Sequence, residues 1–130
     1  MMCRSILFCL LLANAFEMPL YAQGDAFPWP EGKRAALSLS FDDARLSHPD
    51  VGQALFKKLN ATATFYVVPG SMKNRLEGWK KIVADGHEIG NHTVDHPCTG
   101  NFSWARDKAL ENYTLSTMRQ ELLAANHQIK

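Results

Sequence analysis

Two short stretches of the sequence carry side chains that could bind a metal ion and activate water. Asp42 and Asp43 stand side by side in SFDDA, and about fifty residues later GHEIGNHTVDH contains His87, His92 and His96. Two neutral imidazoles and one carboxylate around a divalent ion leave coordination positions open for water and substrate, as hydrolytic metal sites require. Such an ion lowers the pKa of bound water to ~7, and a second carboxylate can accept the proton as the water attacks a carbonyl. The pattern therefore predicts metal-assisted hydrolysis.

The spacing of these residues suggests how they divide the work. His92 and His96 suit one face of a single helical turn, and Pro97 would end that turn because the residue before a proline is disfavoured in helix. Asp42 and Asp43 would point to opposite faces of a strand, unless the strand end is bent. One aspartate could then bind the metal while the other faces the water, and the spacing leaves open which does which.

The strands and helices that the sequence predicts would place both stretches at one edge of a parallel sheet. Three segments have the alternation or the β-branched composition of strands: residues 35–43, 62–68 and 87–90. Three have helical periodicity: 50–60 with Asp50 as its N-cap, 76–85 with Gly86 after it, and 115–129. Repeated strand–helix–strand units predict parallel strands, whose carboxyl ends gather at one rim where ligands bind. We therefore expect the aspartates and histidines to converge there.

Composition and the first residues limit the class of protein. The chain has 130 residues and a formal net charge of +1, which lacks the long-range field that nucleic-acid binding usually needs. Residues 1–22 have the pattern of a secretory signal: Arg4 is a positive start, residues 6–15 form an apolar run, and small Ala22 is a possible cleavage point. A retained membrane anchor is the less favoured alternative, because the run is shorter than the ~20 residues that span a bilayer. Residues 23–33 form an extended lead-in. We expect a secreted or periplasmic protein with no stable membrane insertion after signal removal.

Four other residues in or near the two stretches are also candidates for a role. His87 is expected to be a core or supporting residue, since it comes early in its strand. His48 could contact substrate, although a plain loop residue is favoured. Trp104 could stack on a sugar ring, although packing is favoured. Cys98 could be a metal ligand, but the role of a small buried residue is favoured. It would be the one cysteine left after signal removal, so an internal disulfide is not expected.

The two stretches resemble the first two motifs of the polysaccharide deacetylases, the NodB-homology carbohydrate esterases of family 4. The matching residues are LSLSFDDA and DGHEIGNHTVDH, and the similarity runs from about Arg34 onward. The resemblance implies that Asp42 is the catalytic base, and that Asp43, His92 and His96 bind the metal, usually Zn²⁺. It also implies a deformed (β/α) barrel that removes N- or O-acetyl groups from an acetylated polysaccharide.

The sequence departs from this family in two places and lacks its later motifs. Ser40 stands where threonine is common, and Ala44 where the family often has glycine. The groove arginine, the acetyl-methyl pocket and the general-acid histidine of the family are expected beyond Lys130, so the barrel would be truncated after about the third βα unit. We expect residues 34–130 to be the N-terminal part of a deacetylase catalytic domain. The alternative is a non-catalytic metal- or glycan-binding remnant of such a domain, inactive because the later motifs are missing.

Overall fold

The computed structural model describes residues 28–130, so the expected secretory signal and the start of the lead-in lie outside the described residues. The chain divides into two units, Met1–Ala36 and Leu37–Lys130. Residues 28–36 are exposed and contain a turn in which the Lys33 amide donates to the Pro30 carbonyl at 2.9 Å. Among the described residues, no helix is both long enough and apolar enough to cross a bilayer.

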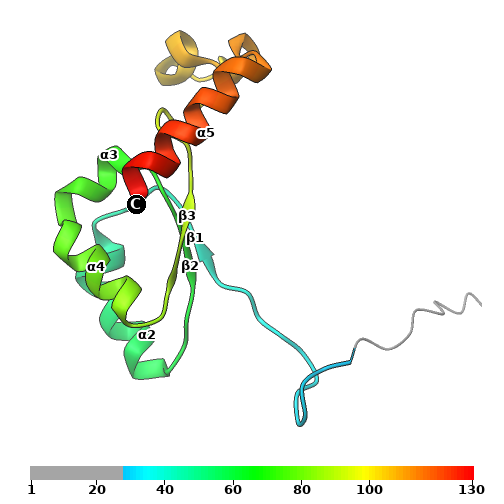
Figure 1. Ribbon diagram of the computed structural model, residues 1–130, viewed down its shortest axis with the longest axis vertical. Helices are drawn as coiled ribbons and strands as arrows, with labels where there is room; N and C mark the ends of the chain where they lie inside the picture. Colours follow the sequence, from blue (N-terminus) through cyan, green and yellow to red (C-terminus); the bar gives the residue numbers. More distant parts are fainter. Residues whose placement is uncertain (1–27) are drawn as a thin grey trace, which may run out of the picture. The chain divides into compact units, whose positions relative to one another are not determined.

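A three-stranded parallel sheet forms the centre of the second unit. Its strands are β1 (Ser40–Phe41), β2 (Thr64–Val67) and β3 (Glu88–Asn91), with β2 between the other two (Figure 1). Three parallel strands were expected from the sequence, and this expectation is confirmed. The first strand is much shorter than the predicted segment 35–43: only Ser40 and Phe41 are in register with β2, and Leu39 before them contributes its carbonyl, which accepts from the Thr64 amide at 2.9 Å. Leu37 shows the consequence, since 83 % of its surface is exposed.

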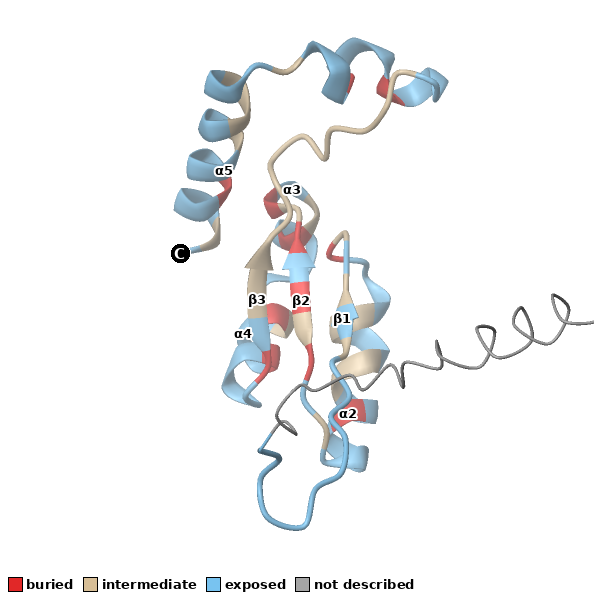
Figure 2. Ribbon diagram, turned by 90° about the vertical axis from the view of Figure 1, so that its right-hand side faces the viewer, coloured by how far each residue is buried: buried red, intermediate tan, exposed pale blue. Residues whose placement is uncertain are grey.

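The hydrophobic core lies between the sheet and the helices on one side of it. Figure 1 shows α2 (Gln53–Leu59), α3 (Pro69–Met72) and α4 (Leu76–Ala84) on this side, and Figure 2 shows the buried residues of β2 and of the helices behind it. β2 and α4 supply the large side chains of this core that are least exposed: Phe65, Val67, Trp79 and Ile82. Burying each such side chain contributes about 1.5–3 kcal/mol, so this packing holds the helices to the sheet.

The opposite face of the sheet is polar and open in the described residues. Strand alternation puts Thr64 and Tyr66 on this face, and Tyr66 is 41 % exposed. The Thr64 hydroxyl donates to the Glu88 carboxylate at 2.8 Å. Tyr66 also covers Gly90 so closely that an added Cβ there would collide with its ring. The two faces of the sheet therefore differ in character, with apolar packing on only one of them.

The start of the first helix differs from the sequence prediction. A π-helical segment, η1 (His48–Gly52), precedes α2, and the residue before it, Ser47, makes no side-chain capping bond. The expected cap, Asp50, is inside η1, and its carboxylate instead accepts from Arg75 Nε at 3.0 Å. The prediction was wrong here because a partner distant in sequence takes the carboxylate that local pattern assigned to the helix end.

The later helices agree better with prediction. α4 matches the expected segment 76–85, and Gly86 follows it with φ of +88°, the left-handed conformation expected of a glycine after a helix. α5 (Leu115–Ile129) begins at Thr114, whose hydroxyl accepts from the Thr117 amide at 3.1 Å. Three short 3₁₀ helices complete the unit: η2 (Lys73–Arg75), η3 (Ser103–Lys108) and η4 (Leu110–Asn112).

His48 is not the plain loop residue that the sequence favoured. It is half-buried in η1, and its ring centroid lies 5.7 Å from that of Phe41, 5.3 Å from Phe65 and 6.0 Å from Trp79. Its buried Nδ1 has no hydrogen-bond partner among the described residues. Burial, helped by the positive charge of Arg45, lowers the pKa of His48 below its ordinary value of 6.5. His48 therefore packs against the aromatic rings of the core, in surroundings that favour its neutral form.

The lowered pKa of His48 predicts a loss of stability in acid. The unfolded chain takes up this proton first, so the stabilisation is complete above about pH 6.5 and is lost as the pH falls toward the lower pKa of the folded state. We expect the melting temperature to drop less between about pH 7.5 and about pH 5.5 in His48→Phe than in the wild type. His127→Gln, an exposed change on α5, is the control and should behave as the wild type. Equal drops in wild type and His48→Phe would contradict the assignment.

Candidate functional site

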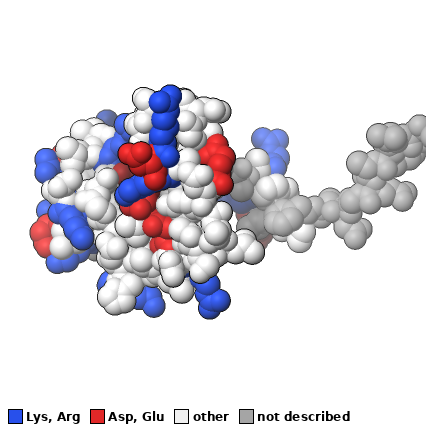
Figure 3. Space-filling view, turned by 90° about the horizontal axis from the view of Figure 1, so that it is seen from above, with Lys and Arg blue, Asp and Glu red and all other residues white. Residues whose placement is uncertain are grey.

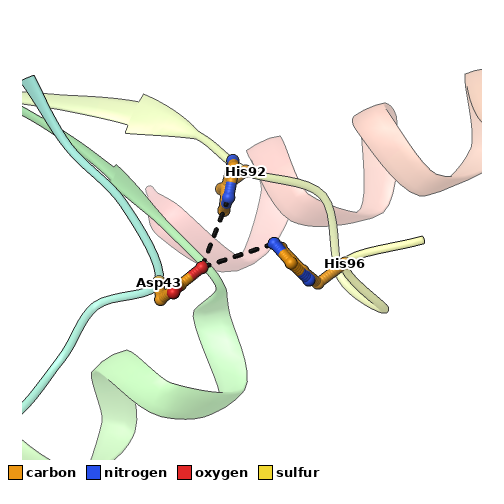
Figure 4. Close-up of side chains that lie close together, drawn as sticks. All are labelled: Asp43, His92 and His96. Carbon is orange, nitrogen blue, oxygen red and sulfur yellow. Dashed lines mark ion pairs between the residues drawn. The ribbon is translucent and has the colours of Figure 1, made fainter. Parts of the chain in front are cut away.

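Asp43, His92 and His96 converge beyond the carboxyl ends of the strands, as Figure 4 shows. The Oδ1 atom of Asp43 lies 3.4 Å from His92 Nε2 and 3.3 Å from His96 Nε2. One ligand atom from each of the three lies within 4.8 Å of the others, and no other such group of histidine, cysteine and acidic residues occurs in the described part of the chain. The sequence expectation that the two stretches would converge is confirmed.

The two separations between the Asp43 oxygen and the imidazole nitrogens fit a small tetrahedral ion. Bonds of about 2.0–2.1 Å in a tetrahedral site place two ligand atoms about 3.3 Å apart. The separations of 3.3 and 3.4 Å agree with this geometry, and both exceed the ~2.7–2.9 Å of a charge-assisted hydrogen bond. The side chains of Asp43, His92 and His96 are 35 %, 28 % and 42 % exposed, so solvent can reach the positions that three protein ligands leave open.

A bend at the end of β1 separates the two aspartates. Asp43 and Ala44 have φ of +72° and +51°, so the backbone leaves the strand direction directly after Asp42. Asp42 is exposed, whereas Asp43 is half-buried and faces the histidines. The Oδ2 atom of Asp43 accepts from Arg45 Nη2 at 3.0 Å, which leaves Oδ1 for the histidines. Neighbouring aspartates therefore have different surroundings, as different roles require.

The segment from His92 to His96 is a loop, and the single helical turn expected from the spacing is not formed. Thr93 and His96 have φ of +60° and +49°, which a right-handed helix does not allow. Side chains replace the helical bonds: the His96 amide donates to Thr93 Oγ1 at 3.0 Å, and the Thr93 amide donates to Asn91 Oδ1 at 2.7 Å. The two imidazole rings still come within 4.8 Å of each other, centroid to centroid.

The remaining sequence candidates lie outside the group formed by Asp43, His92 and His96. His87 is buried and its Nδ1 accepts from the Ala63 amide at 3.1 Å, which confirms the expected core role. Cys98 is a free thiol of intermediate exposure, neither buried nor among the ligands. Trp104 stacks on Phe102 with ring centroids 5.7 Å apart, so it packs against one neighbour, but it is 66 % exposed and is not part of the core.

The surroundings of the site are mixed in charge and partly apolar. Figure 3 shows acidic and basic side chains interspersed over the upper face, in agreement with the net charge of +1. A recess of about 190 Å³ adjoins the histidines, lined by His92, Thr93, His96, Pro97, Leu110 and Met118. The walls of the recess are largely apolar, and the charged side chains around it are of both signs (Figure 3), so its surroundings suit a largely neutral ligand.

Comparison with known proteins places these features in one family. A family model described as polysaccharide deacetylase matches residues 30–130. A chitooligosaccharide deacetylase of Bradyrhizobium sp. (strain ANU 289) is 35 % identical over 82 residues, which cover 62 % of this chain and 36 % of the relative. The chain thus spans about a third of that relative's length.

Solved structures agree with the family model and with the expected fold class. A peptidoglycan N-acetylglucosamine deacetylase matches with a TM-score of 0.57 and 25 % identity, over 71 % of this chain and 38 % of that one. A mutant of a carbohydrate esterase family 4 pseudoenzyme from Bacillus anthracis, with restored enzymatic activity, matches with a TM-score of 0.55 and 26 % identity, over 71 % and 30 %. The α/β fold is therefore that of the deformed (β/α) barrel deacetylases.

Ala44 provides a test of the bend that directs Asp43. Ala44→Gly should change the free energy of unfolding by less than about 1 kcal/mol, because relief of the left-handed backbone offsets the lost Cβ contacts. Ala44→Val should lower it by more than about 2 kcal/mol, because a β-branched residue is strained at this φ and the site is 2 % exposed. Urea denaturation measures both, and equal stabilities of the two variants would contradict a constrained bend.

Proposed function

This chain belongs to the polysaccharide deacetylase family, and we propose that it supplies the metal-binding part of a hydrolase that removes acetyl groups from an acetylated polysaccharide. The observation that carries the proposal is the convergence of Asp43 Oδ1, His92 Nε2 and His96 Nε2, in which the carboxylate oxygen lies from each imidazole nitrogen at the separation of a tetrahedral site. Membership of the family alone would not distinguish a complete site from a degenerate one. The geometry of these three residues supports a complete metal site.

The three ligand residues have the chemistry that Zn²⁺ requires. His92 and His96 would present neutral Nε2 atoms and Asp43 would present one carboxylate oxygen, while Arg45 holds the other. When bound, the divalent ion lowers the pKa of water to ~7 and polarises the carbonyl of the acetyl group. The exposure of all three side chains supports access by both water and substrate.

Asp42 is the proposed catalytic base. Its position directly before the bend leaves it exposed and outside the group of three ligand atoms, so its carboxylate oxygens are available to accept the proton of the attacking water. The family resemblance assigns the two aspartates in this order. The separate surroundings of Asp42 and Asp43 support the assignment.

The proposed substrate is a chain of acetylated sugars. The similar proteins include a chitooligosaccharide deacetylase and a peptidoglycan N-acetylglucosamine deacetylase, and both names denote removal of acetyl groups from glycans. The near-neutral charge of the chain suits such a substrate better than a polyanion. The signal pattern of residues 1–22 supports action outside the cytoplasm, where extended polysaccharides occur.

A second candidate function is non-catalytic binding of metal or glycan. The similarity to a family 4 pseudoenzyme favours this function, because it shows that the same fold also occurs in a protein named as lacking activity. The two functions share the metal site and differ in turnover. Measurements of metal binding and of acetate release, made on the same full chain, separate them.

Zinc binding is the first prediction of the proposal. The full chain should bind one Zn²⁺, and His92→Ala or Asp43→Ala should weaken binding by at least about 100-fold, because each removes one of three ligands. Isothermal titration calorimetry measures the affinity. His127→Ala, an exposed histidine on α5, should bind as the wild type does. Wild-type affinity in His92→Ala would rule out the proposed ligand set.

The role of Asp42 is tested by separating binding from turnover. Asp42→Asn should keep Zn²⁺ affinity within about threefold and lose at least about 100-fold in deacetylation, because it removes the proton acceptor and no ligand. Acetate release from acetylated chito-oligosaccharides measures turnover. Unchanged turnover in Asp42→Asn would exclude its role as base, and a wild type that binds zinc without releasing acetate would favour the non-catalytic function.

A further inference from the structure

A carboxylate on α5 binds the middle of the loop that carries both histidines. The Oε2 atom of Glu121 accepts from the backbone amides of Val94 at 3.0 Å and Asp95 at 2.9 Å. These two residues lie between His92 and His96 in sequence. One side chain, distant in sequence and outside the group of ligand atoms, thus restrains the segment whose two ends hold the proposed ligands.

The loop needs this kind of partner because of its own conformation. Thr93 and His96 are left-handed, so the Val94 and Asp95 amides cannot enter the regular bonds of a helix. Successive amides that point to the same side form a concave site for a negative charge, and charge-assisted bonds are about twice as strong as neutral ones. Glu121 supplies that charge to both amides with a single oxygen.

The same helix also holds the start of the loop. Asn91, the last residue of β3, donates from Nδ2 to the Leu122 carbonyl and to Asn126 Oδ1, both at 2.8 Å. The helix itself is fixed by Ala125, which is fully buried. The loop is therefore held to α5 at two places, and only the Glu121 contact involves the backbone between the histidines.

We propose that Glu121 is a positioning residue for the metal site: it holds the loop in the conformation that directs Nε2 of His92 and of His96 toward Asp43. The proposal rests on the proposed metal-binding function of these three residues. Glu121 acts through the backbone and is not one of the three proposed ligands, so its substitution removes no ligand side chain. Without it the loop samples other conformations, and metal binding must then order the loop as well.

Zinc affinity shows whether Glu121 positions the histidine loop or only helps to attach α5 to the sheet. Glu121→Ala should weaken Zn²⁺ binding to the full chain by about 10- to 100-fold, the range for outer residues that orient metal ligands. Glu121→Gln should lie between, because its amide oxygen still accepts both bonds but without charge. Asn126→Ala is the matched control, since it removes a contact of α5 with Asn91 and none with the loop amides. Wild-type affinity in Glu121→Ala, or an equal loss in Asn126→Ala, would overturn the proposal.

Amide hydrogen exchange without metal gives an independent readout. The Val94 and Asp95 amides should exchange at least about tenfold faster in Glu121→Ala than in the wild type and in Asn126→Ala. Should Glu121→Ala fail to fold, the comparison is made with Glu121→Gln. Unchanged exchange overturns the positioning role even if the metal function is correct. A wild type that binds no Zn²⁺ overturns the proposed metal function, and faster exchange would then still show that Glu121 orders the loop.

Discussion

The pairing of β2 with both neighbouring strands in parallel decides where every candidate functional side chain lies. Parallel pairing puts the carboxyl ends of all three strands on one edge, so that Asp43 after β1 and His92 after β3 meet across β2. The pairing even includes a proposed ligand, because the His92 amide donates to the Val67 carbonyl at 3.2 Å. The buried side chains of Phe65 and Val67 hold β2 in place, and so the core and the site depend on the same strand.

The sequence predicts those parts of the structure that depend on local pattern. β-branched runs and helical periodicity identified β2, α4 and α5, and repeated strand–helix units were sufficient to predict parallel strands and the convergence of Asp43 with the histidines. The resemblance to deacetylases then assigned roles within the group. Residue spacing alone left the order of Asp42 and Asp43 open, since the bend between them has no clear local signal when alanine follows.

What the sequence did not predict depends on partners far along the chain. His92 and His96 have the spacing of a helical turn, but Glu121 takes the amides between them and stabilises a loop instead. Asp50 has the type and position of a helix cap, but Arg75 binds its carboxylate. Contacts of this kind join residues about 25 positions or more apart, and no pattern within one element contains them.

The division of the Asp43 carboxylate has a consequence for metal selectivity. Because Arg45 occupies Oδ2, only Oδ1 is directed at the histidines, and Asp43 would be a monodentate ligand. Ca²⁺ takes six to eight oxygen ligands and often a bidentate carboxylate, whereas one carboxylate oxygen with two imidazoles satisfies a smaller ion of low coordination number. An arginine that never touches the ion would thus discriminate between metals by fixing the denticity of its neighbour.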